Sequence, residues 1–204
     1  MKPKVKICGF TNAENARAAS LLGIDAVGLV FYDKSPRCVE VATAVEIINA
    51  LPPFVNRVGL FVNADSDFID EILCEVPLDT LQFHGDESPA ECGQYAMPFI
   101  KALRVTAEMD IAKMAQEYHQ ASGLLLDAFH EEAYGGTGNQ FDWGLAKVEI
   151  DLPIILAGGL NPETVFNAVK QVNPYALDVS SGVESSKGIK DMNKVKHFIQ
   201  QVKL

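Results

Sequence analysis

Eight short runs rich in β-branched and other apolar residues recur along the chain, with helix-like patterns between them. Such alternation is typical of βα units wrapped around a parallel sheet. With boundaries defined to about two to four residues, the predicted strands cover residues 4–8, 26–31, 57–62, 80–84, 99–105, 123–128, 153–157 and 175–180. Eight units in 204 residues leave about 25 residues for each, enough for a strand, a helix and two short loops.

This count predicts an α/β fold, a closed (β/α)8 TIM barrel that forms a single domain over residues 1–204. The alternative, an open doubly wound sheet, usually has fewer strands and an early GxGxxG turn, a fingerprint that this sequence lacks. Two helix starts are also indicated. Thr11 and Glu14 have the spacing of a capping box, and Asn161 precedes a proline at the first turn of a helix.

Charge and hydropathy limit the partners of the chain. Its formal charge is −10, from 17 Lys and Arg against 27 Asp and Glu, which argues against nucleic acid because nucleic-acid recognition depends on phosphate neutralisation. The longest apolar stretch, residues 26–32, is about seven residues, whereas a membrane span needs roughly 18. The basic residues 1–6 are not followed by the apolar segment of a signal peptide. We expect a cytoplasmic protein, and an anionic small molecule remains compatible with it if its charge is met locally.

The cysteines indicate neither a metal site nor a redox site. No CxxC spacing and no neighbouring pair of histidines accompanies the four of them, Cys8, Cys38, Cys74 and Cys92. Free thiols are the usual state in the cytoplasm. We therefore expect no metal and no disulfide.

The strongest local signal is a pair of small-residue turns after the last two predicted strands. Backbone N–H groups in such turns can approach an anion closely, and loops after the seventh and eighth strands of a barrel often bind phosphate. The alternative is ordinary turn chemistry, but two such turns in the two expected positions favour a phosphate site. The residues concerned are Gly158, Gly159, Ser180, Ser181 and Gly182.

Cys8 and Asp127 lie at the ends of predicted strands, where side chains point into the mouth of a barrel. A cysteine in such a place is most often a small buried hydrophobe, but near an anion site and helix N-termini its thiolate is favoured and can act as a base or nucleophile. Asp127 interrupts an apolar strand, and burial of a carboxyl group favours its protonated, proton-donating form. The alternative for Asp127 is a cap of a helix or loop.

Three further residues have both a functional and a structural interpretation. Arg37 follows a polar loop and is suited to a bidentate contact with a carboxylate, although a solvated arginine is the default. His84 ends its strand and is equally compatible with a structural hydrogen bond. Asp178 has an apolar setting like that of Asp127, but it precedes the end of its strand, which favours a structural role.

These residues belong to motifs that together resemble the phosphoribosylanthranilate isomerase family. The matching segments follow the order of the family and extend over nearly the whole chain. They are residues 5–9 with 11–12, 31–32 with 35–37, 58–59 with 61–63, 82–85, 126–127, 135–138 with 141–143, 158–162 and 178–184. The sequence departs from the family at Asn139-Gln140, where some relatives carry a lysine, and at Phe83, where leucine is usual.

The resemblance implies a (β/α)8 barrel that catalyses an Amadori rearrangement in tryptophan biosynthesis without a cofactor. N-(5-phosphoribosyl)anthranilate becomes 1-(2-carboxyphenylamino)-1-deoxyribulose 5-phosphate. Asp127 is then the general acid that protonates the furanose ring oxygen, and Cys8 is the general base. Arg37 pairs with the anthranilate carboxylate, and positive potential around Cys8 favours its thiolate. The remaining implied substrate-binding residues are His84, Gly135, Gly136, Gly158, Gly159, Asp178, Ser180, Ser181 and Gly182.

Three other functions are less consistent with these residues. Another phosphosugar-converting barrel, such as indole-glycerol-phosphate synthase, needs lysines at strand ends, and we expect Lys6 to point away from Cys8 and Lys101 to lie too early in its strand. A pentose-phosphate epimerase needs metal ligands, and the four histidines form no evident cluster. A catalytically inactive phosphate-binding barrel would have lost Cys8 or Asp127. The partner expected is therefore a small phosphorylated substrate, bound by a monomer or a homodimer.

Overall fold

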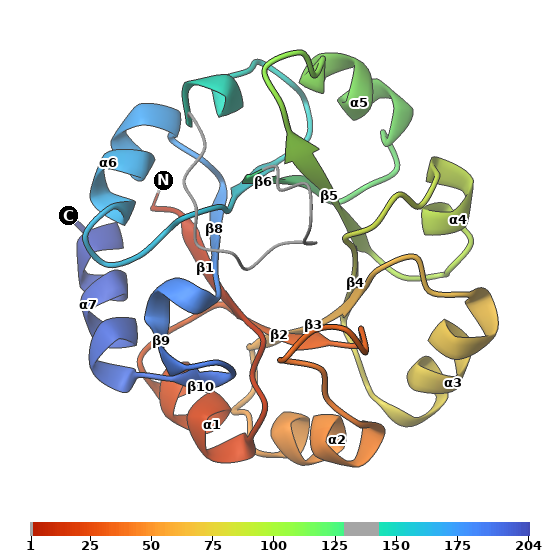
Figure 1. The fold of residues 1–204 in the computed structure, drawn as a ribbon, viewed down its shortest axis with the longest axis vertical. Coiled ribbons are helices and arrows are strands. Elements are labelled where there is room, and N and C mark those ends of the chain that lie inside the picture. Colours follow the sequence, from red (N-terminus) through yellow and green to blue (C-terminus); the bar gives the residue numbers. More distant parts are fainter. Residues whose placement is uncertain (1, 129–142) are drawn as a thin grey trace.

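Eight parallel strands form a closed barrel in sequence order, and helices surround it (Figure 1). The computed structural model of the protein describes residues 2–128 and 143–204. The strands are β1 (Lys4–Cys8), β2 (Ala26–Val30), β3 (Asn56–Phe61), β4 (Thr80–Phe83), β5 (Phe99–Val105), β6 (Gly123–Ala128), β7 (Ile154–Leu156) and β8 (Ala176–Val179). The predicted (β/α)8 fold is confirmed, and every predicted strand boundary lies within one residue of the observed one.

The helices lie outside the barrel (Figure 1). They are α1 (Ala13–Leu21), α2 (Val41–Asn49), α3 (Ser66–Glu75), α4 (Pro89–Gly93), α5 (Ile111–Glu117), α6 (Val165–Val172) and α7 (Met192–Val202), with 3-10 turns η1 (Trp143–Ala146) and η2 (Ser181–Val183). An unpredicted antiparallel hairpin, β9 (Glu184–Ser186) with β10 (Ile189–Lys190), follows η2. No helix in the described part of the chain is long and apolar enough to span a membrane.

The two predicted helix starts differ in detail from the observed ones. Asn12, not Thr11, caps α1: its side chain accepts from the N–H of Asn15, while the Thr11 hydroxyl donates to the Gly188 carbonyl. The capping box with Glu14 therefore does not form. The Asn161 side chain accepts from two N–H groups, those of residues 163 and 164, so it caps a turn that precedes α6.

Burial alternates along the strands, and this alternation separates two environments. On β1, Val5 and Ile7 pack into the main apolar core, which lies between the barrel and the helices. Lys6 and Cys8 alternate with them and therefore face the barrel interior, because successive strand residues point to opposite faces. The interior holds two small apolar clusters, one of which contains Cys8, and several buried polar side chains. The buried ionisable groups of the barrel interior are therefore candidates for catalysis.

Gly28 on β2 lies directly opposite Cys8 in the register of the first two strands. A Cβ atom at Gly28 would lie 2.8 Å from the Cys8 Sγ and 3.0 Å from the Cys8 Cα. Because the Cα belongs to a paired strand and cannot give way, Gly28→Ala is expected to lower the free energy of unfolding by about 1–3 kcal/mol, as overpacking does. Urea denaturation followed by circular dichroism measures this change.

The matched control is Gly93→Ala at the end of α4, where the added Cβ would meet only the flexible end of the Gln120 side chain. We expect this variant to stay within about 0.5 kcal/mol of the wild type. Equal stability of the two variants would show that Gly28 is not needed to accommodate Cys8.

Candidate active site

The barrel brings four of the predicted site residues into its interior from four separate strands. Cys8 ends β1, His84 follows β4, Asp127 lies on β6 and Asp178 on β8, and each side chain is buried. The carboxyl ends of parallel barrel strands share one mouth, so the observed placement agrees with that predicted. The arrangement provides a thiol, an imidazole and two carboxyl groups in one enclosed volume.

His84 and Asp127 face each other. The His84 Nε2 lies 3.4 Å from the Asp127 Oδ2, too far for a strong hydrogen bond, and no described residue accepts a hydrogen bond from this nitrogen. On the other side of the ring, the Gln82 amide Nε2 lies 2.9 Å from the His84 Nδ1. If the Gln82 N–H donates there, neutral His84 carries its proton on Nε2, directed towards Asp127. A small movement of either side chain, or a bound ligand, would give this N–H a hydrogen-bond acceptor.

The Cys8 thiol has an environment that the sequence did not predict. Burial raises its pKa, the Lys6 and Lys190 ammonium groups oppose this rise, and the Asp178 carboxylate adds to it. Local positive charge does favour the thiolate, as expected, but in the free protein desolvation outweighs it, so that the pKa of Cys8 is raised on balance. Burial therefore favours the thiol over the thiolate in the free protein.

Lys6 also differs from expectation. We expected it to point away from Cys8, but residues two apart on a strand share a face, and Lys6 points into the barrel. Its Nζ lies 2.9 Å from the Asp178 Oδ2, and both side chains are buried. The other strand lysine, Lys101, is the third residue of β5, as expected, and its buried side chain lies beside Tyr118 and pairs with Glu87.

Arg37 is bound by an internal carboxylate. Its Nε and Nη2 each donate to Glu184, at 2.8 Å, while its Nη1 has no hydrogen-bond partner among the described residues. Lys190 lies on the other side, with its Nζ 2.7 Å from the Glu184 Oε1. The sequence indicated neither partner, although Glu184 ends one of the matched motifs. Gly9, at a φ of 79°, makes room for Arg37, since a Cβ there would lie 2.4 Å from the Arg37 Cδ.

The turns after β7 and β8 have the backbone geometry expected of an anion site. Gly158 and Gly159 have φ values of 78° and 70°, which glycine alone adopts readily. Gly182 passes so close to the other turn that a Cβ there would lie 2.0 Å from the Leu160 carbonyl oxygen. Within the described residues, the N–H groups of Gly158, Gly159, Ser181 and Gly182 donate to no protein acceptor. The predicted binding residues Gly135 and Gly136 lie outside the described residues.

Two polar atoms near these turns differ in their hydrogen bonding. The Ser180 hydroxyl donates to the Cys8 carbonyl at 2.9 Å, joining the first strand to the turn after the last one. The Asp178 Oδ1 is buried and has no hydrogen-bond partner among the described residues. An acceptor left in this state costs free energy unless a ligand or water donates to it.

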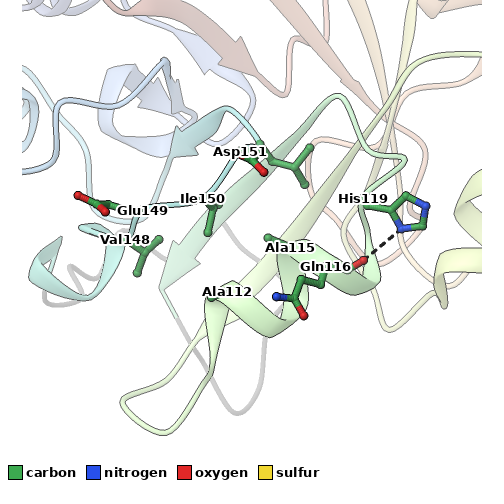
Figure 2. Close-up of a pocket in the computed structure, with 9 residues that line it drawn as sticks. Ala112, Ala115, Gln116, His119, Val148, Glu149, Ile150 and Asp151 are labelled. Atoms are coloured by element: carbon green, nitrogen blue, oxygen red, sulfur yellow. Dashed lines mark hydrogen bonds between the residues drawn. The ribbon is translucent and has the colours of Figure 1, made fainter.

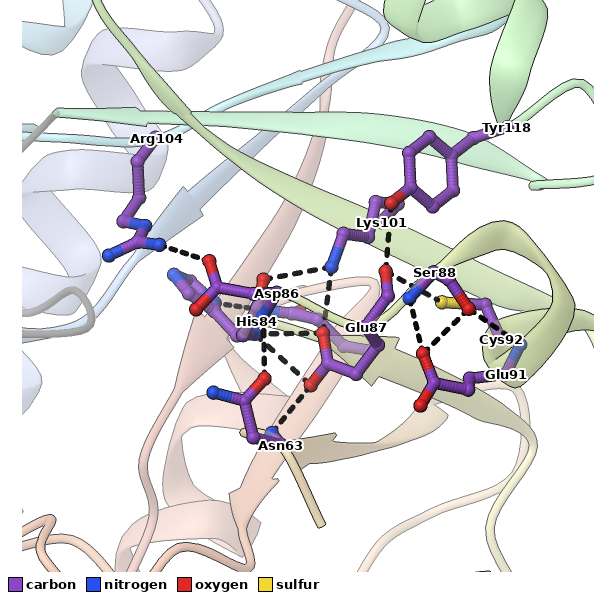
Figure 3. A network of polar contacts seen from close by, with 12 residues as sticks. Asn63, His84, Asp86, Glu87, Ser88, Glu91, Cys92, Lys101, Arg104 and Tyr118 are labelled. Carbon is purple, nitrogen blue, oxygen red and sulfur yellow. Dashed lines mark hydrogen bonds and ion pairs between the residues drawn. The ribbon is translucent and has the colours of Figure 1, made fainter. Parts of the chain in front are cut away.

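A buried network fixes the ends of β3 and β4 (Figure 3). The Glu87 carboxylate accepts from the Asn63 N–H at 2.7 Å, from the Gly85 N–H at 2.9 Å and from the Lys101 Nζ at 2.7 Å. Arg104, one strand further on, pairs with Asp86 at the rim of the same network. Because Gly85 follows His84 directly, this network fixes the backbone beside His84.

A separate groove of about 710 Å³ lies between α5 and the segment that leads into β7 (Figure 2). Ala112, His119 and Asp151 are among its lining residues. The only side-chain contact drawn there is from the His119 ring to the Gln116 carbonyl, at 3.1 Å. A segment that enters a strand lies at the opposite end of the barrel from the mouth, so this groove is separate from the candidate site.

The fold and the ionisable groups buried at its mouth define a (β/α)8-barrel enzyme. A family model described as N-(5'phosphoribosyl)anthranilate (PRA) isomerase matches residues 5–201. The chain belongs to this family.

Individual relatives agree with this assignment. An N-(5'-phosphoribosyl)anthranilate isomerase of Pseudomonas fluorescens is 58% identical over 198 residues, which cover 97% of this chain and 94% of the relative. One of Thiobacillus denitrificans is 51% identical over 203 residues, which cover 100% of this chain and 99% of the relative. The crystal structure of the Thermotoga maritima enzyme has a TM-score of 0.90 at 41% identity and covers 98% of each chain. Another phosphoribosyl anthranilate isomerase structure, at 40% identity and a TM-score of 0.85 with 98% of each chain covered, is a complex with reduced 1-(o-carboxyphenylamino)-1-deoxyribulose 5-phosphate.

Proposed function

We propose that this chain is a cytoplasmic isomerase of tryptophan biosynthesis. It converts N-(5'-phosphoribosyl)anthranilate to 1-(2-carboxyphenylamino)-1-deoxyribulose 5-phosphate. The observation that carries the proposal is the burial of a thiol, Cys8, and a carboxyl group, Asp127, at the ends of two strands around one mouth, in a chain of this family. The mouth described belongs to one chain, so the proposed chemistry is the same for a monomer and for a homodimer.

The first step is acid catalysis by Asp127. Its carboxyl proton passes to the furanose ring oxygen while the bond from that oxygen to C1' breaks. The lone pair of the anilino nitrogen forms the new C=N bond, which leaves an iminium ion and a carboxylate at Asp127. The position of Asp127 supports this role, because the carboxyl group is buried inside the barrel, where little bulk water competes in the proton transfer.

The second step is base catalysis by Cys8. The iminium ion acidifies the proton on C2', and the Cys8 thiolate removes it to give an enolamine. Tautomerisation of the enolamine then yields the ketone. Burial favours the thiol form of Cys8 in the free protein, so the thiol must first lose its proton, and the positive charge of the iminium ion favours that ionisation.

The unpaired polar groups of the mouth suit the rest of the substrate. The 5'-phosphate would accept hydrogen bonds from the open turns after β7 and β8, with Gly135 and Gly136 as further contacts, and the anthranilate carboxylate would accept from the free Nη1 of Arg37. The Asp178 Oδ1 and the His84 Nε2 are placed for sugar hydroxyls. The aromatic ring would pack on the apolar cluster beside Cys8, formed by Val30, Leu60 and Val62 with Tyr32.

Gly182→Ala tests the phosphate turns. The added Cβ would displace the Leu160 carbonyl and separate the two turns, so we expect KM to rise at least about tenfold, the loss of roughly one good charge-assisted hydrogen bond. Steady-state kinetics with the phosphorylated substrate measure it. Inorganic phosphate should also inhibit the variant more weakly than the wild type. An unchanged KM together with unchanged phosphate inhibition would place the phosphate elsewhere.

The activity itself is tested with substrate made in situ from anthranilate and phosphoribosyl pyrophosphate by the corresponding transferase. We expect the fluorescence of the substrate to decay in proportion to the amount of this protein added. If no enzyme-dependent decay occurs while phosphate still binds, the chain is a phosphate-binding barrel without this activity.

A further inference from the structure

A buried lysine lies below the thiol on the same strand. Lys6 and Cys8 are two residues apart on β1 and point to the same side, and Lys6 is aligned with Asp178 on β8. The Lys6 Nζ lies 2.9 Å from the Asp178 Oδ2, with side chains only 5% and 7% exposed. Because residues two apart on a strand share a face, the Lys6 ammonium group and the Cys8 thiol lie on the same side of β1, close enough for the charge of one to act on the other. Lys6 thus lies between a carboxylate and a thiol inside the barrel.

This pair is an unusual way to fill a barrel interior. Taking an ammonium and a carboxylate out of water costs more than packing apolar side chains of the same size, unless every polar atom is satisfied. Here the Asp178 Oδ1 has no partner among the described residues, so the pair is not fully satisfied. A well-packed apolar pair would serve stability better, which points to a role for the charge itself.

We propose that Lys6 is a positioning residue for Cys8: its ammonium group, anchored by Asp178, stabilises the thiolate that the proposed proton transfer requires. The proposal rests on the proposed role of Cys8 as the general base. Lys6 keeps all of its protons throughout, and the thiol proton leaves to water at the mouth. Asp178 then has two functions: its Oδ2 anchors the Lys6 ammonium group, and its Oδ1 accepts a hydrogen bond from a hydroxyl group of the substrate.

The charges that face Cys8 come from several elements. Lys190, on β10, is a second cation, and its charge is shared with Glu184. Asp178, on β8, opposes both cations, and His84 and Asp127 act electrostatically on Asp178. Arg37 is a further cation nearby, held in a bidentate contact with Glu184, the carboxylate that also pairs with Lys190. Of the two lysines, Lys6 lowers the pKa of Cys8 more strongly, against the rise that burial causes.

The test uses two variants that break the same ion pair but leave opposite charges behind. Lys6→Met removes the cation and leaves Asp178, whereas Asp178→Asn removes the anion and leaves Lys6. The rate of Cys8 alkylation by iodoacetamide is measured from pH 7 to 10 by peptide mass spectrometry, in a background with the exposed Cys38 and Cys74 changed to serine. Since only the thiolate reacts, the rate follows its fraction.

We expect Lys6→Met to slow Cys8 alkylation at pH 8.5 at least tenfold, and Asp178→Asn to accelerate it. Opposite shifts identify an electrostatic effect of Lys6, because loss of a merely structural contact would change access to Cys8 in the same direction in both variants. Shifts of the same sign, or no change in Lys6→Met, would overturn the proposal.

The double variant, Lys6→Met with Asp178→Asn, keeps the test decisive if a single variant does not fold, since it leaves no buried charge unpaired. Its alkylation is expected to be slower than that of the wild type, and an equal or faster rate would count against Lys6.

Kinetics separate this proposal from the function on which it rests. In Lys6→Met, kcat should fall about tenfold at neutral pH and recover as pH rises, in step with the thiolate fraction. A pH-independent loss would contradict the positioning role of Lys6 while leaving the isomerase activity intact. Failure of the proposed base itself would show instead as wild-type turnover in a Cys8→Ala variant.

Discussion

Asp127→Asn is expected to lower kcat by about two to four orders of magnitude with little change in KM. The amide keeps the shape of the side chain on β6, but it has no acidic proton to give to the furanose ring oxygen. Ring opening would then rely on water, which the enclosed interior largely excludes. Stopped-flow or steady-state fluorescence of the substrate measures the loss.

The control for this variant is Asp151→Asn, at an exposed carboxylate in the segment that leads into β7, at the other end of the barrel. It makes the same chemical change outside the mouth and should leave kcat within about twofold of the wild type. Wild-type turnover in Asp127→Asn would mean that another group supplies the proton, with His84 as the nearest described candidate at 3.4 Å.

Cys8→Ala is expected to reduce kcat by a similar factor, about two to four orders of magnitude, because no other described side chain replaces the thiolate at the end of β1. The substrate should still bind, since the turns after β7 and β8 are untouched, so KM should change little. A burst of ring-opened intermediate without product, seen by rapid-quench analysis, would place the block at removal of the C2' proton.

Cys74→Ala is the matched control, because Cys74 is an exposed thiol on α3. Its kcat should equal that of the wild type. If Cys8→Ala retained full activity while Cys74→Ala did as well, the base would have to be sought among the other groups of the interior, Asp178 first.

The strands could be predicted accurately because their signal is local. Each of the eight runs carries its own β-branched or apolar residues, and the closed register follows once eight of them exist. The β9–β10 hairpin could not be predicted in this way: it has only three and two residues, and its residues read as a loop. The residue that caps α1 is one position later than predicted, because the Thr11 hydroxyl bonds instead to a distant partner, the Gly188 carbonyl.

The same distinction between local and long-range information applies to the site. Cys8, Asp127 and the glycine turns could be predicted because a position at a strand end defines a position at the mouth. The partners that set their charge could not, because they depend on closure of the barrel. Glu184 holds Arg37 across 147 residues of sequence, and Asp178 holds Lys6 across 172. The raised pKa of the Cys8 thiol has the same origin, since the sequence alone shows neither the burial that raises it nor the charged neighbours.

The hydrogen bond from the Ser180 hydroxyl to the Cys8 carbonyl, with the β1–β8 pairing beside it, has a consequence for the order of events during synthesis. The first strand leaves the ribosome early, but the strand that completes its surroundings emerges about 170 residues later in the chain. Until then the thiol near the N-terminus is an ordinary exposed cysteine. The point at which Cys8 becomes protected from alkylation therefore marks the closure of the barrel in a nascent chain.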